Sequence, residues 1–312
     1  MSSNTSQPTV LVIGATGRHG RTGARVVEQL INHNRAVRVL IRSDDDRATQ
    51  LRQLGAQTVV GDLHDRRTLI PAVEDVESVY FTYPIAAGIV PAAANLASAI
   101  RQVGITPHVV VMSMGPSTAD SPSELGRAQW SAEEILAWAG LNPTVLRVAG
   151  LFYENISTLH AESIRANDYF ANSFGDAPAP WISGQDAADI GVTALLHPER
   201  FAESPISFLP AAELHSHATI AAMISKIVDR EISYQHISRE QWQAALEHAA
   251  TRGHSTINLA MAQHISTIGA GLANAGANSH RTANPTAVQD LIGRTPMTLE
   301  QFLTENSAQF VS

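Results

Sequence analysis

The sequence predicts an α/β protein, with a doubly wound parallel sheet over residues 8–150 and a smaller α+β lobe over residues 151–312. Three observations carry this prediction. Short β-rich runs alternate with helical patterns through the first half, and this order builds right-handed strand–helix–strand units. The runs are almost wholly apolar, as strands covered on both faces of a sheet must be. A glycine-rich turn joins the first run to the first helical pattern.

The elements of the first half follow in order. Strands are expected over residues 9–14, 36–41, 56–61, 77–83, 107–113 and 143–148. Helices are expected over residues 20–31, 45–55, 65–73, 88–104 and 123–140. Asp65 precedes the third helix and is a suitable N-cap for it. The stop of three helical patterns at Gly55, Gly104 and Gly140 agrees with these bounds, because glycine favours the end of a helix.

The pattern is looser after residue 150. A helix is expected over 184–197, short strands over 204–210 and 230–238, and further helices near 216–229, 238–250, 257–268 and 297–308. Residues 269–287 are rich in glycine, asparagine and alanine, so a mobile loop is expected there. We expect this lobe to bind the substrate and part of the chain to return to the parallel sheet.

Composition excludes several classes of protein. The net charge is −8, which disfavours nucleic-acid partners. The chain has no cysteine, so disulfides and thiolate metal sites are excluded. The thirteen histidines form no helical metal-binding pair with a carboxylate, and no metal is expected. With neither a signal-like start nor an apolar run of membrane-spanning length, a cytoplasmic protein with no membrane partner is expected.

The segment "TVLVIGATGRHGRTG" indicates a phosphate site. Gly14, Gly17 and Gly20 recur at three-residue spacing between a strand and a helix. Glycine permits a tight turn and a close approach of the main chain, and the helix N-terminus offers free N–H groups to a pyrophosphate. In this strand–turn–helix context the pattern predicts a dinucleotide-binding Rossmann domain. The loop residues expected to contact the cofactor are Gly14, Thr16, Gly17, Arg18, His19 and Gly20.

Charge at the end of the second strand favours NADP(H) over NAD(H). Arg42 stands at the position where an acid would bind the ribose hydroxyl of NAD, and arginine accommodates a 2′-phosphate instead. Arg18 is a candidate second guanidinium for the same phosphate. The acidic run over 44–46 is interpreted as the cap and first turn of the next helix, directed to solvent. Asp62 and Leu63 end the third strand, where the adenine is expected.

Several motifs together resemble the NmrA-like family of atypical short-chain dehydrogenase/reductases: "VLVIGATGRHG", "VRVLIRS", "VVGDL", "LNPTVLRVAGLFYENI" and "LIGRTPMTLEQFL". The family contains NADPH-dependent reductases of quinones, dyes and phenylpropanoid-type substrates, and also redox sensors that bind the dinucleotide without turnover. The resemblance implies that the later strand ends complete the cofactor site. Those ends carry Tyr83, Ser113, Met114, Val148 and Gly150.

The usual proton donor of related reductases is missing. They carry Tyr-x-x-x-Lys on the helix after the fifth strand, whereas this chain has Leu125 and Gln129 there and a single lysine, Lys226, elsewhere. Without that acid, either the substrate delocalises the charge that hydride brings, or another residue supplies the proton. Tyr153 is the preferred candidate, followed by Tyr83 and Ser113, and Gln129 is a candidate to hydrogen-bond the nicotinamide ribose or a substrate oxygen.

The residues expected to line the substrate pocket are mostly aromatic: Tyr83, Met114, Trp130, Phe152, Tyr153 and Trp181. Two functions remain open. The first is an NADPH-dependent reductase of a small conjugated or aromatic substrate, working as a monomer or homodimer. The second is a non-catalytic sensor that acts through a protein partner. An apolar cleft between the two parts favours the enzyme, and a filled cleft with a large exposed apolar patch favours the sensor.

Overall fold

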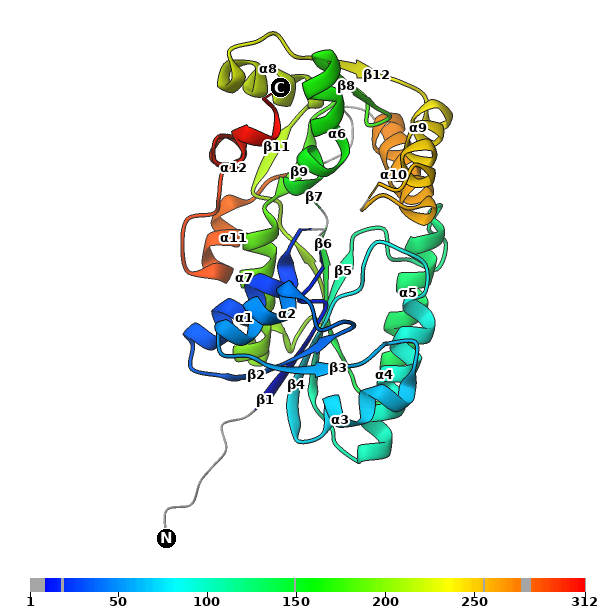
Figure 1. Cartoon of the computed structure of the whole chain (residues 1–312), viewed down its shortest axis with the longest axis vertical. Coiled ribbons are helices and arrows are strands. Elements are labelled where there is room, and N and C mark those ends of the chain that lie inside the picture. The colour runs from blue at the N-terminus through cyan, green and yellow to red at the C-terminus, as the bar shows by residue number, and fades with distance from the viewer. Residues whose placement is uncertain (1–8, 18–19, 149, 255, 276–281, 312) are drawn as a thin grey trace.

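The computed structural model describes residues 9–17, 20–148, 150–254, 256–275 and 282–311. Its centre is a seven-stranded parallel sheet in the order β10-β6-β5-β4-β1-β2-β3 (Figure 1). The strands are β1 Thr9–Ile13, β2 Ala36–Ile41, β3 Gln57–Val60, β4 Val76–Phe81, β5 His108–Met114, β6 Thr144–Val148 and β10 Ile206–Leu209. The doubly wound fold predicted from the alternation of runs is confirmed.

Helices cover both faces of the sheet. On one face lie α1 Thr22–Asn32, α2 Asp46–Gln53 and α7 Gly184–Leu196 (Figure 1). The other face carries α3 Ile70–Val73, preceded by the 3-10 turn Arg66–Leu69, together with α4 Ile89–Val103 and α5 Glu124–Trp138. The side chains of the central strands are buried on both faces, which explains why these runs contain almost no polar residue. The edge strands β3 and β10 are partly exposed. Asp65 accepts from the Arg67 amide and caps the 3-10 turn, as predicted.

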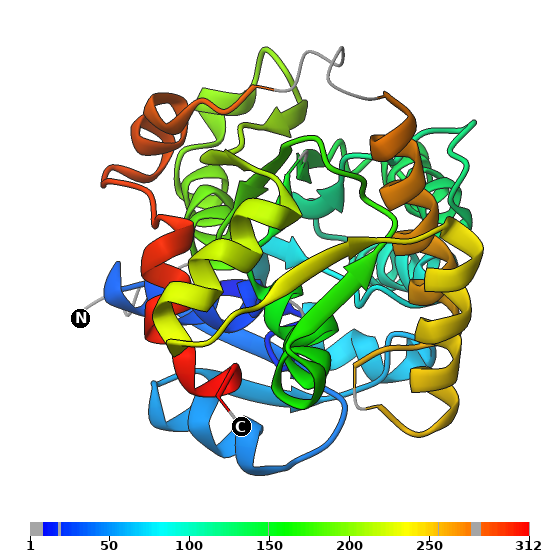
Figure 2. The same ribbon diagram turned by 90° about the horizontal axis from the view of Figure 1, so that it is seen from above.

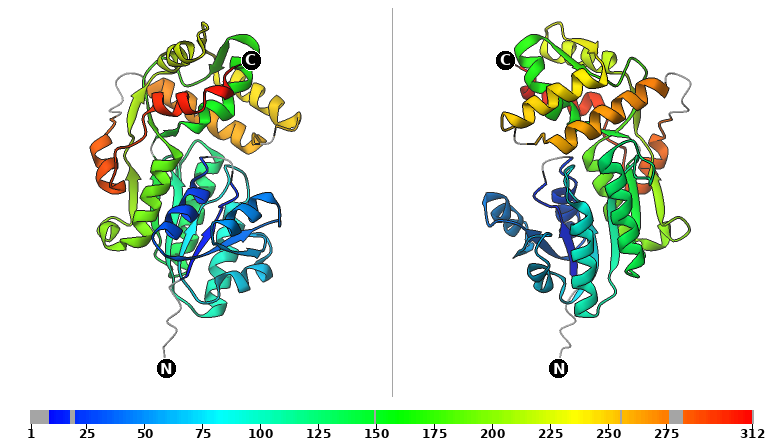
Figure 3. Two further views of the ribbon diagram at one scale, coloured as in Figure 1. Left: turned by 60° about the vertical axis from the view of Figure 1, so that its left-hand side comes forward. Right: turned by 90° about the vertical axis from the view of Figure 1, so that its right-hand side faces the viewer.

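The lobe sits on the end of the sheet where the parallel strands finish (Figure 3). Its strands are β7 Leu151–Phe152, β9 Ala179–Ile182 and β11 Glu213–His215 in one small sheet, and β8 Tyr169–Asn172 and β12 Ser233–His236 in another. Its helices are α6 Glu154–Asn167, α8 His217–Val228, α9 Arg239–Thr251, α10 Leu259–Ala275, α11 Pro285–Ile292 and α12 Leu299–Glu305, with 3-10 turns at Pro198–Phe201 and Ser307–Gln309. Figure 2 shows α9 and α10 side by side.

The chain returns from the lobe to the sheet. Helix α7 packs on the face that α1 covers, and β10 pairs with β6 at the sheet edge. Elements after residue 150 thus belong to both parts of the molecule, and the domain boundary at residue 150 stays a prediction. No helix in the described part of the chain is long and apolar enough to span a membrane.

The expected loop over 269–287 is wrong at both ends. Helix α10 continues to Ala275, and α11 begins at Pro285. Gly269, the first residue of the expected loop, lies inside α10, and its missing Cβ has a packing reason, because a methyl group there would lie 2.7 Å from the Ser173 Oγ atom. A glycine that lets two elements approach is compatible with a helix interior. Residues 276–281 fall outside the described part.

Candidate functional site

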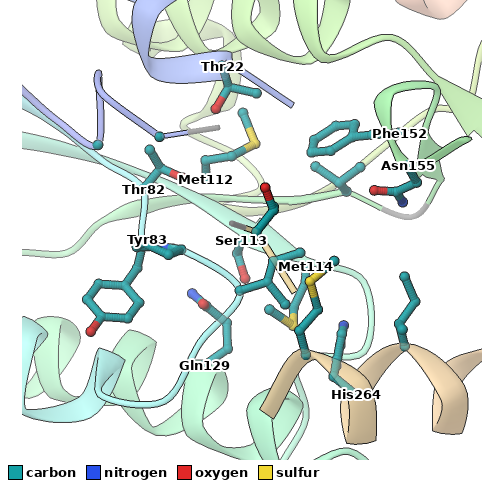
Figure 4. Close-up of a pocket in the computed structure, with 18 of the residues that line it drawn as sticks. Thr22, Thr82, Tyr83, Met112, Ser113, Met114, Gln129, Phe152, Asn155 and His264 are labelled. Atoms are coloured by element: carbon teal, nitrogen blue, oxygen red, sulfur yellow. The ribbon is translucent and has the colours of Figure 1, made fainter. Parts of the chain in front are cut away.

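A cleft of about 890 Å³ opens at the carboxyl ends of the parallel strands, between the sheet and α10. Ligands of open α/β sheets bind at this edge. The sheet side of the cleft carries Gly14, Thr16, Gly17, Thr22, Arg42, Asp62, Leu63, Tyr83, Met112, Ser113, Met114, Gln129, Val148 and Gly150, and the start of the lobe adds Phe152 from β7 and Asn155 from α6. The lobe side carries Met261, His264, Ile265, Ile268 and Leu272 from α10 (Figure 4).

The glycine loop has the geometry that a pyrophosphate requires. Gly14 has a φ of +91°, and a Cβ there would lie 2.4 Å from the Thr82 Cγ2 atom. The Gly17 amide closes the turn on the Gly14 carbonyl at 2.9 Å. Helix α1 then begins with no side-chain cap, so its first N–H groups are left for a ligand. The residues of this loop therefore fit a bound dinucleotide.

The predicted cofactor contacts of three further residues of this loop are not seen in the described part of the cleft lining. Arg18 and His19 lie outside the described residues. Gly20 lies outside the cleft lining, and a Cβ there would lie 2.9 Å from the Phe152 ring. Its glycine is thus explained by the close contact with Phe152, and its contact with the cofactor stays a prediction.

Three polar residues gather where a 2′-phosphate is expected. Arg42 and Ser43 line the cleft at the end of β2, and Arg47, from the first turn of α2, lines it beside them. The nearby acids are engaged elsewhere: Asp45 caps α2 and pairs with Arg47 at 2.6 Å, and Asp44 pairs with Arg52 at 2.8 Å. Arg47 also donates to the Thr16 carbonyl at 3.1 Å, which ties it to the glycine loop. Sequence reasoning missed Arg47.

The ends of β3 and β4 form the end of the cleft where the adenine is expected. Asp62 and Leu63 line it, and the Asp62 carboxylate accepts from the His64 amide at 2.9 Å. The Tyr83 hydroxyl lies 2.8 Å from the His64 Nε2 atom. In Figure 4 this hydroxyl points away from Ser113 and Gln129. The hydroxyl also donates to the Ala87 carbonyl at 3.2 Å, so Tyr83 is poorly placed to protonate a substrate at the Ser113 end.

Ser113 is bonded to a buried ion pair beneath the cleft. Its hydroxyl donates to Glu133 Oε1, which also accepts from the Ser117 hydroxyl at 2.8 Å. The other oxygen of Glu133 pairs with Arg147, and both charged side chains are buried. Because the hydroxyl proton is directed at Glu133, Ser113 presents acceptor lone pairs to the cleft. As a proton donor it is therefore disfavoured.

Two amide side chains in the lining have buried atoms without a hydrogen-bond partner in the described part of the chain. These atoms are Gln129 Nε2, a donor, and Asn155 Oδ1, an acceptor. Buried polar atoms are almost always paired in native proteins. Unpaired atoms on a cleft wall therefore indicate positions where a ligand completes the hydrogen bonding. Figure 4 shows both side chains reaching into the cleft.

Three aromatic predictions lie outside the cleft lining, and they need correction. Tyr153 is fully buried in the lobe, and its hydroxyl donates to Glu213 Oε2 at 2.8 Å. Burial and the Glu213 charge raise the pKa of this phenol far above its ordinary value. Trp181 is equally buried and donates to the His215 carbonyl. Trp130 is half-buried on α5. The prediction that Tyr153 is the proton donor is wrong, because this residue faces the lobe core.

The wall that replaces these aromatics is aliphatic. Met261, Ile265, Ile268 and Leu272 recur along one stripe of α10, and they line the same cleft as Met112 and Met114 at the end of β5. The sequence predicted a helix near 257–268, but no pattern within it says which edge of the sheet it covers. The orientation of α10 is set by contacts distant in sequence, and single-sequence periodicity cannot reveal such contacts.

Helix α10 is anchored to the start of α5 beside the cleft. The Ser123 Oγ atom lies 2.6 Å from His264 Nδ1, and Gln263 accepts from the Glu124 amide. Ser123 is the N-cap of α5, and its Oγ also accepts from the Gly126 amide at 3.2 Å. His264 thus joins the lobe to the sheet domain and lines the cleft. No cluster that suits a metal ion occurs within the described ranges.

Comparisons with known proteins agree with this geometry. The model of the NmrA-like family matches residues 6–303. An NAD(P)H azoreductase of Xenophilus azovorans is 30% identical over 242 residues, which cover 76% of this chain and 80% of that protein. An NADPH-dependent quinone oxidoreductase of Escherichia coli, solved with NADPH, is 21% identical with a TM-score of 0.75, covering 96% of this chain and 98% of that one. The negative transcriptional regulator Nmra, solved with NAD, is 15% identical with a TM-score of 0.70, covering 96% and 95%.

Proposed function

Because the chain belongs to the NmrA-like family, we propose that it is an NADPH-dependent reductase of a small conjugated substrate of the quinone, enone, ketone or imine type. One observation carries the proposal: an apolar wall of α10 faces the end of β5, in the same cleft as a glycine loop that fits a pyrophosphate. The azoreductase relative supports a nicotinamide-dependent reduction, since it is 30% identical to this chain over 242 residues.

The proposed cofactor is NADP(H). Arg42 lines the cleft at the end of β2 and makes no hydrogen bond among the described residues, so its guanidinium can bind the phosphate. Ser43 and Arg47 line the cleft beside it and both donate to Asp45, while Asp44 is paired with Arg52. Guanidinium groups suit a phosphate because of their charge and their forked geometry. The 2′-phosphate is therefore expected beside Arg42.

The nicotinamide end is proposed to lie at Ser113, Gln129 and Asn155. The reduced ring supplies the hydride when the cofactor is bound. Gln129 Nε2 offers a donor, and Asn155 Oδ1 and the Ser113 oxygen offer acceptors, to ligands that carry amide or hydroxyl groups. The aliphatic stripe of α10 excludes water above the ring and favours a flat apolar substrate.

Among the described residues that line the cleft there is no lysine to form a Tyr–Lys acid pair. Leu125 is buried on α5, and Lys226 is exposed on α8. This suits substrates whose carbonyl charge is delocalised as hydride arrives, since they need little help from an acid. We therefore rank quinones and enones above simple ketones.

The sensor alternative lacks a supporting observation. A sensor would have a filled cleft and one large exposed apolar patch, whereas this cleft is open. Exposed large apolar side chains in the described part are spread over several elements: Ile206 and Phe208 share β10, whereas Val60 lies on β3 and Trp138 on α5. The likeness to Nmra shows the fold alone.

The test is NADPH oxidation by the purified protein against a panel of quinones, enones, ketones and imines. Turnover is expected for quinones or enones, with weaker activity when NADH replaces NADPH. Tight NADPH binding without turnover on any member of the panel would reject the reductase and favour the sensor.

A further inference from the structure

We propose that His264 is a catalytic residue of this site, which hydrogen-bonds the substrate oxygen through a neutral imidazole protonated on Nε2. Ser123 is the positioning residue that fixes this tautomer. The proposal rests on the reductase function proposed above and applies to carbonyl substrates. It follows from the Ser123–His264 contact of 2.6 Å and from the place of His264 in the cleft lining.

A different donor is needed because the three hydroxyl groups that the sequence suggested as proton donors are hydrogen-bonded elsewhere. Tyr153 donates to Glu213 inside the lobe, and Ser113 donates to Glu133 beneath the cleft. Tyr83 lies at the adenine end, hydrogen-bonded to His64. A substrate at the end of β5 therefore meets none of these protons.

The tautomer of His264 follows from the hydrogen bonds of Ser123. The Ser123 side chain is fully buried, and its oxygen accepts from the Gly126 amide. Its own proton needs an acceptor, and within the described residues the acceptor at hydrogen-bond distance is His264 Nδ1. When Nδ1 accepts, a neutral imidazole carries its proton on Nε2. The nitrogen that a ligand would meet is then a donor.

The position of His264 in the cleft suits a hydrogen-bond donor to the substrate. His264 and Gln129 project from α10 and α5 toward the Ser113–Met114 end of β5 (Figure 4). A substrate oxygen between them would receive one hydrogen bond from Nε2–H and one from the Gln129 amide.

The proposed step balances as follows. The substrate carbon gains a hydride, and the electron pair of the C=O bond moves to the oxygen or to its conjugated equivalent. The substrate is reduced, and the nicotinamide is oxidised. His264 keeps its proton and stabilises the oxyanion by hydrogen bonding, as donors of an oxyanion site do. The oxyanion then takes its proton from water.

Substitutions at His264 test the donor. The full-length enzyme is assayed with NADPH and the best quinone of the panel. His264→Leu is expected to lower kcat about 100-fold, the usual effect of losing one oxyanion donor. His264→Gln retains an N–H near the Nε2 position, so kcat should stay within about tenfold of wild type. NADPH affinity should be unchanged in both variants, and His236→Leu, at an exposed histidine of the same lobe, is the control.

Two kinetic outcomes overturn the inference: a His264→Leu variant whose kcat stays within about threefold of wild type, or a His264→Gln variant that falls as far as His264→Leu. Both require an active wild type. A wild type that reduces no member of the panel rejects the proposed function itself, so the two failures are distinguishable.

The tautomer has its own readout, which does not depend on activity. Nitrogen-15 NMR of the imidazole in the cofactor-free protein, assigned by comparison with His264→Gln, should show the proton on Nε2. Ser123→Thr keeps the hydroxyl and the helix cap, so it should preserve this pattern, whereas Ser123→Ala should lose it and lower kcat. A wild-type proton on Nδ1, or no change in Ser123→Ala, overturns the proposal.

Discussion

Arg42 and Arg47 both line the cleft, but their guanidinium groups are held differently. Arg47 is tied to Asp45 and to the Thr16 carbonyl, whereas Arg42 makes no hydrogen bond among the described residues. Arg47 therefore shapes the loop, and Arg42 can turn toward a phosphate. This difference decides which of the two should govern the choice between NADPH and NADH.

Arg42→Ala should lower the affinity for NADPH roughly 10- to 100-fold and leave NADH nearly unchanged, because one charge-assisted hydrogen bond is worth about 1.5–3 kcal/mol. Dissociation constants for both dinucleotides, from nicotinamide fluorescence, check this. Arg67→Ala is the control, since Arg67 is exposed, pairs with a cap residue and lies outside the cleft lining. Equal losses for NADPH and NADH would contradict the role of Arg42.

The buried Glu133–Arg147 ion pair should contribute to the stability of the fold. Glu133→Gln should lower the free energy of unfolding by about 3 kcal/mol, because it leaves the Arg147 charge buried without its counter-charge. Urea unfolding measures the loss. Glu134→Gln, one residue along α5 and partly exposed, should change stability by less than about 0.5 kcal/mol. A double variant with methionine at both positions 133 and 147 should recover much of the loss.

At the scale of elements, two glycines in helices have opposite surroundings. A Cβ on Gly184, the first residue of α7, would lie 2.0 Å from the Gly20 carbonyl oxygen, whereas a Cβ on Gly271 in α10 has no atom within 4 Å. Gly184→Ala should therefore push α7 against the glycine loop, lower stability by about 1–3 kcal/mol and weaken NADPH binding. Gly271→Ala should raise stability by roughly 0.5–1 kcal/mol.

Thermal and urea unfolding, together with NADPH titration, compare the two alanine variants. A Gly184→Ala variant that matches wild type in both stability and affinity would show that the loop adjusts without cost. If Gly271→Ala were destabilising, the helical geometry of α10 at that position would be in doubt.

The sequence predicted those elements whose pattern lies within the segment itself. The six predicted strands that became β1 to β6 are apolar runs bounded by turn residues, so their signal lies within each segment. Helix α6 was missed because "ENISTLHAESIRAN" has polar residues around much of its surface. Strand β12 lies within the strand predicted over 230–238, whereas β7, with two residues, is too short to give any pattern.

The residues of the site also differ in whether the sequence could predict them. Gly14, Arg42, Asp62 and Ser113 were predictable, because parallel strands finish at one edge and carry these residues to the cleft. His264 was not, because its partner Ser123 lies 141 residues away in the sequence. Tyr153 was misassigned for a related reason: its contact with Glu213 exists only in the folded lobe.

At the scale of the whole molecule, the lobe buries histidines within a cluster of rings. His160 stacks on Phe170 and Trp242, and His217 stacks on Phe174 and Tyr234. Burial lowers the pKa of His160 to about 3 and lowers that of His217 well below its ordinary value. The folded lobe therefore holds both rings neutral, whereas the unfolded chain protonates them near pH 6.5.

The consequence is a loss of stability in acid. Between the unfolded and folded pKa values the unfolded state binds more protons, so stability falls as the pH falls from 6.5 toward 3. His160 alone should cost about 2 kcal/mol at pH 5 relative to pH 8. Glu154 opposes this trend, because burial raises the pKa of its carboxyl to about 7, and its contribution falls as the pH rises from 4.5 through 7.

The difference between two proteins isolates the histidine contribution from that of Glu154. His160→Phe keeps a ring against Phe170 and Trp242 but cannot be protonated. Free energies of unfolding in urea at pH 8 and pH 5 should therefore fall less for His160→Phe than for wild type, by about 2 kcal/mol. His236→Gln, which removes an exposed histidine of the same lobe, should follow wild type. If His160→Phe and wild type lose equal stability between these pH values, the ring cluster does not hold His160 neutral, and the acid sensitivity of the lobe has another source.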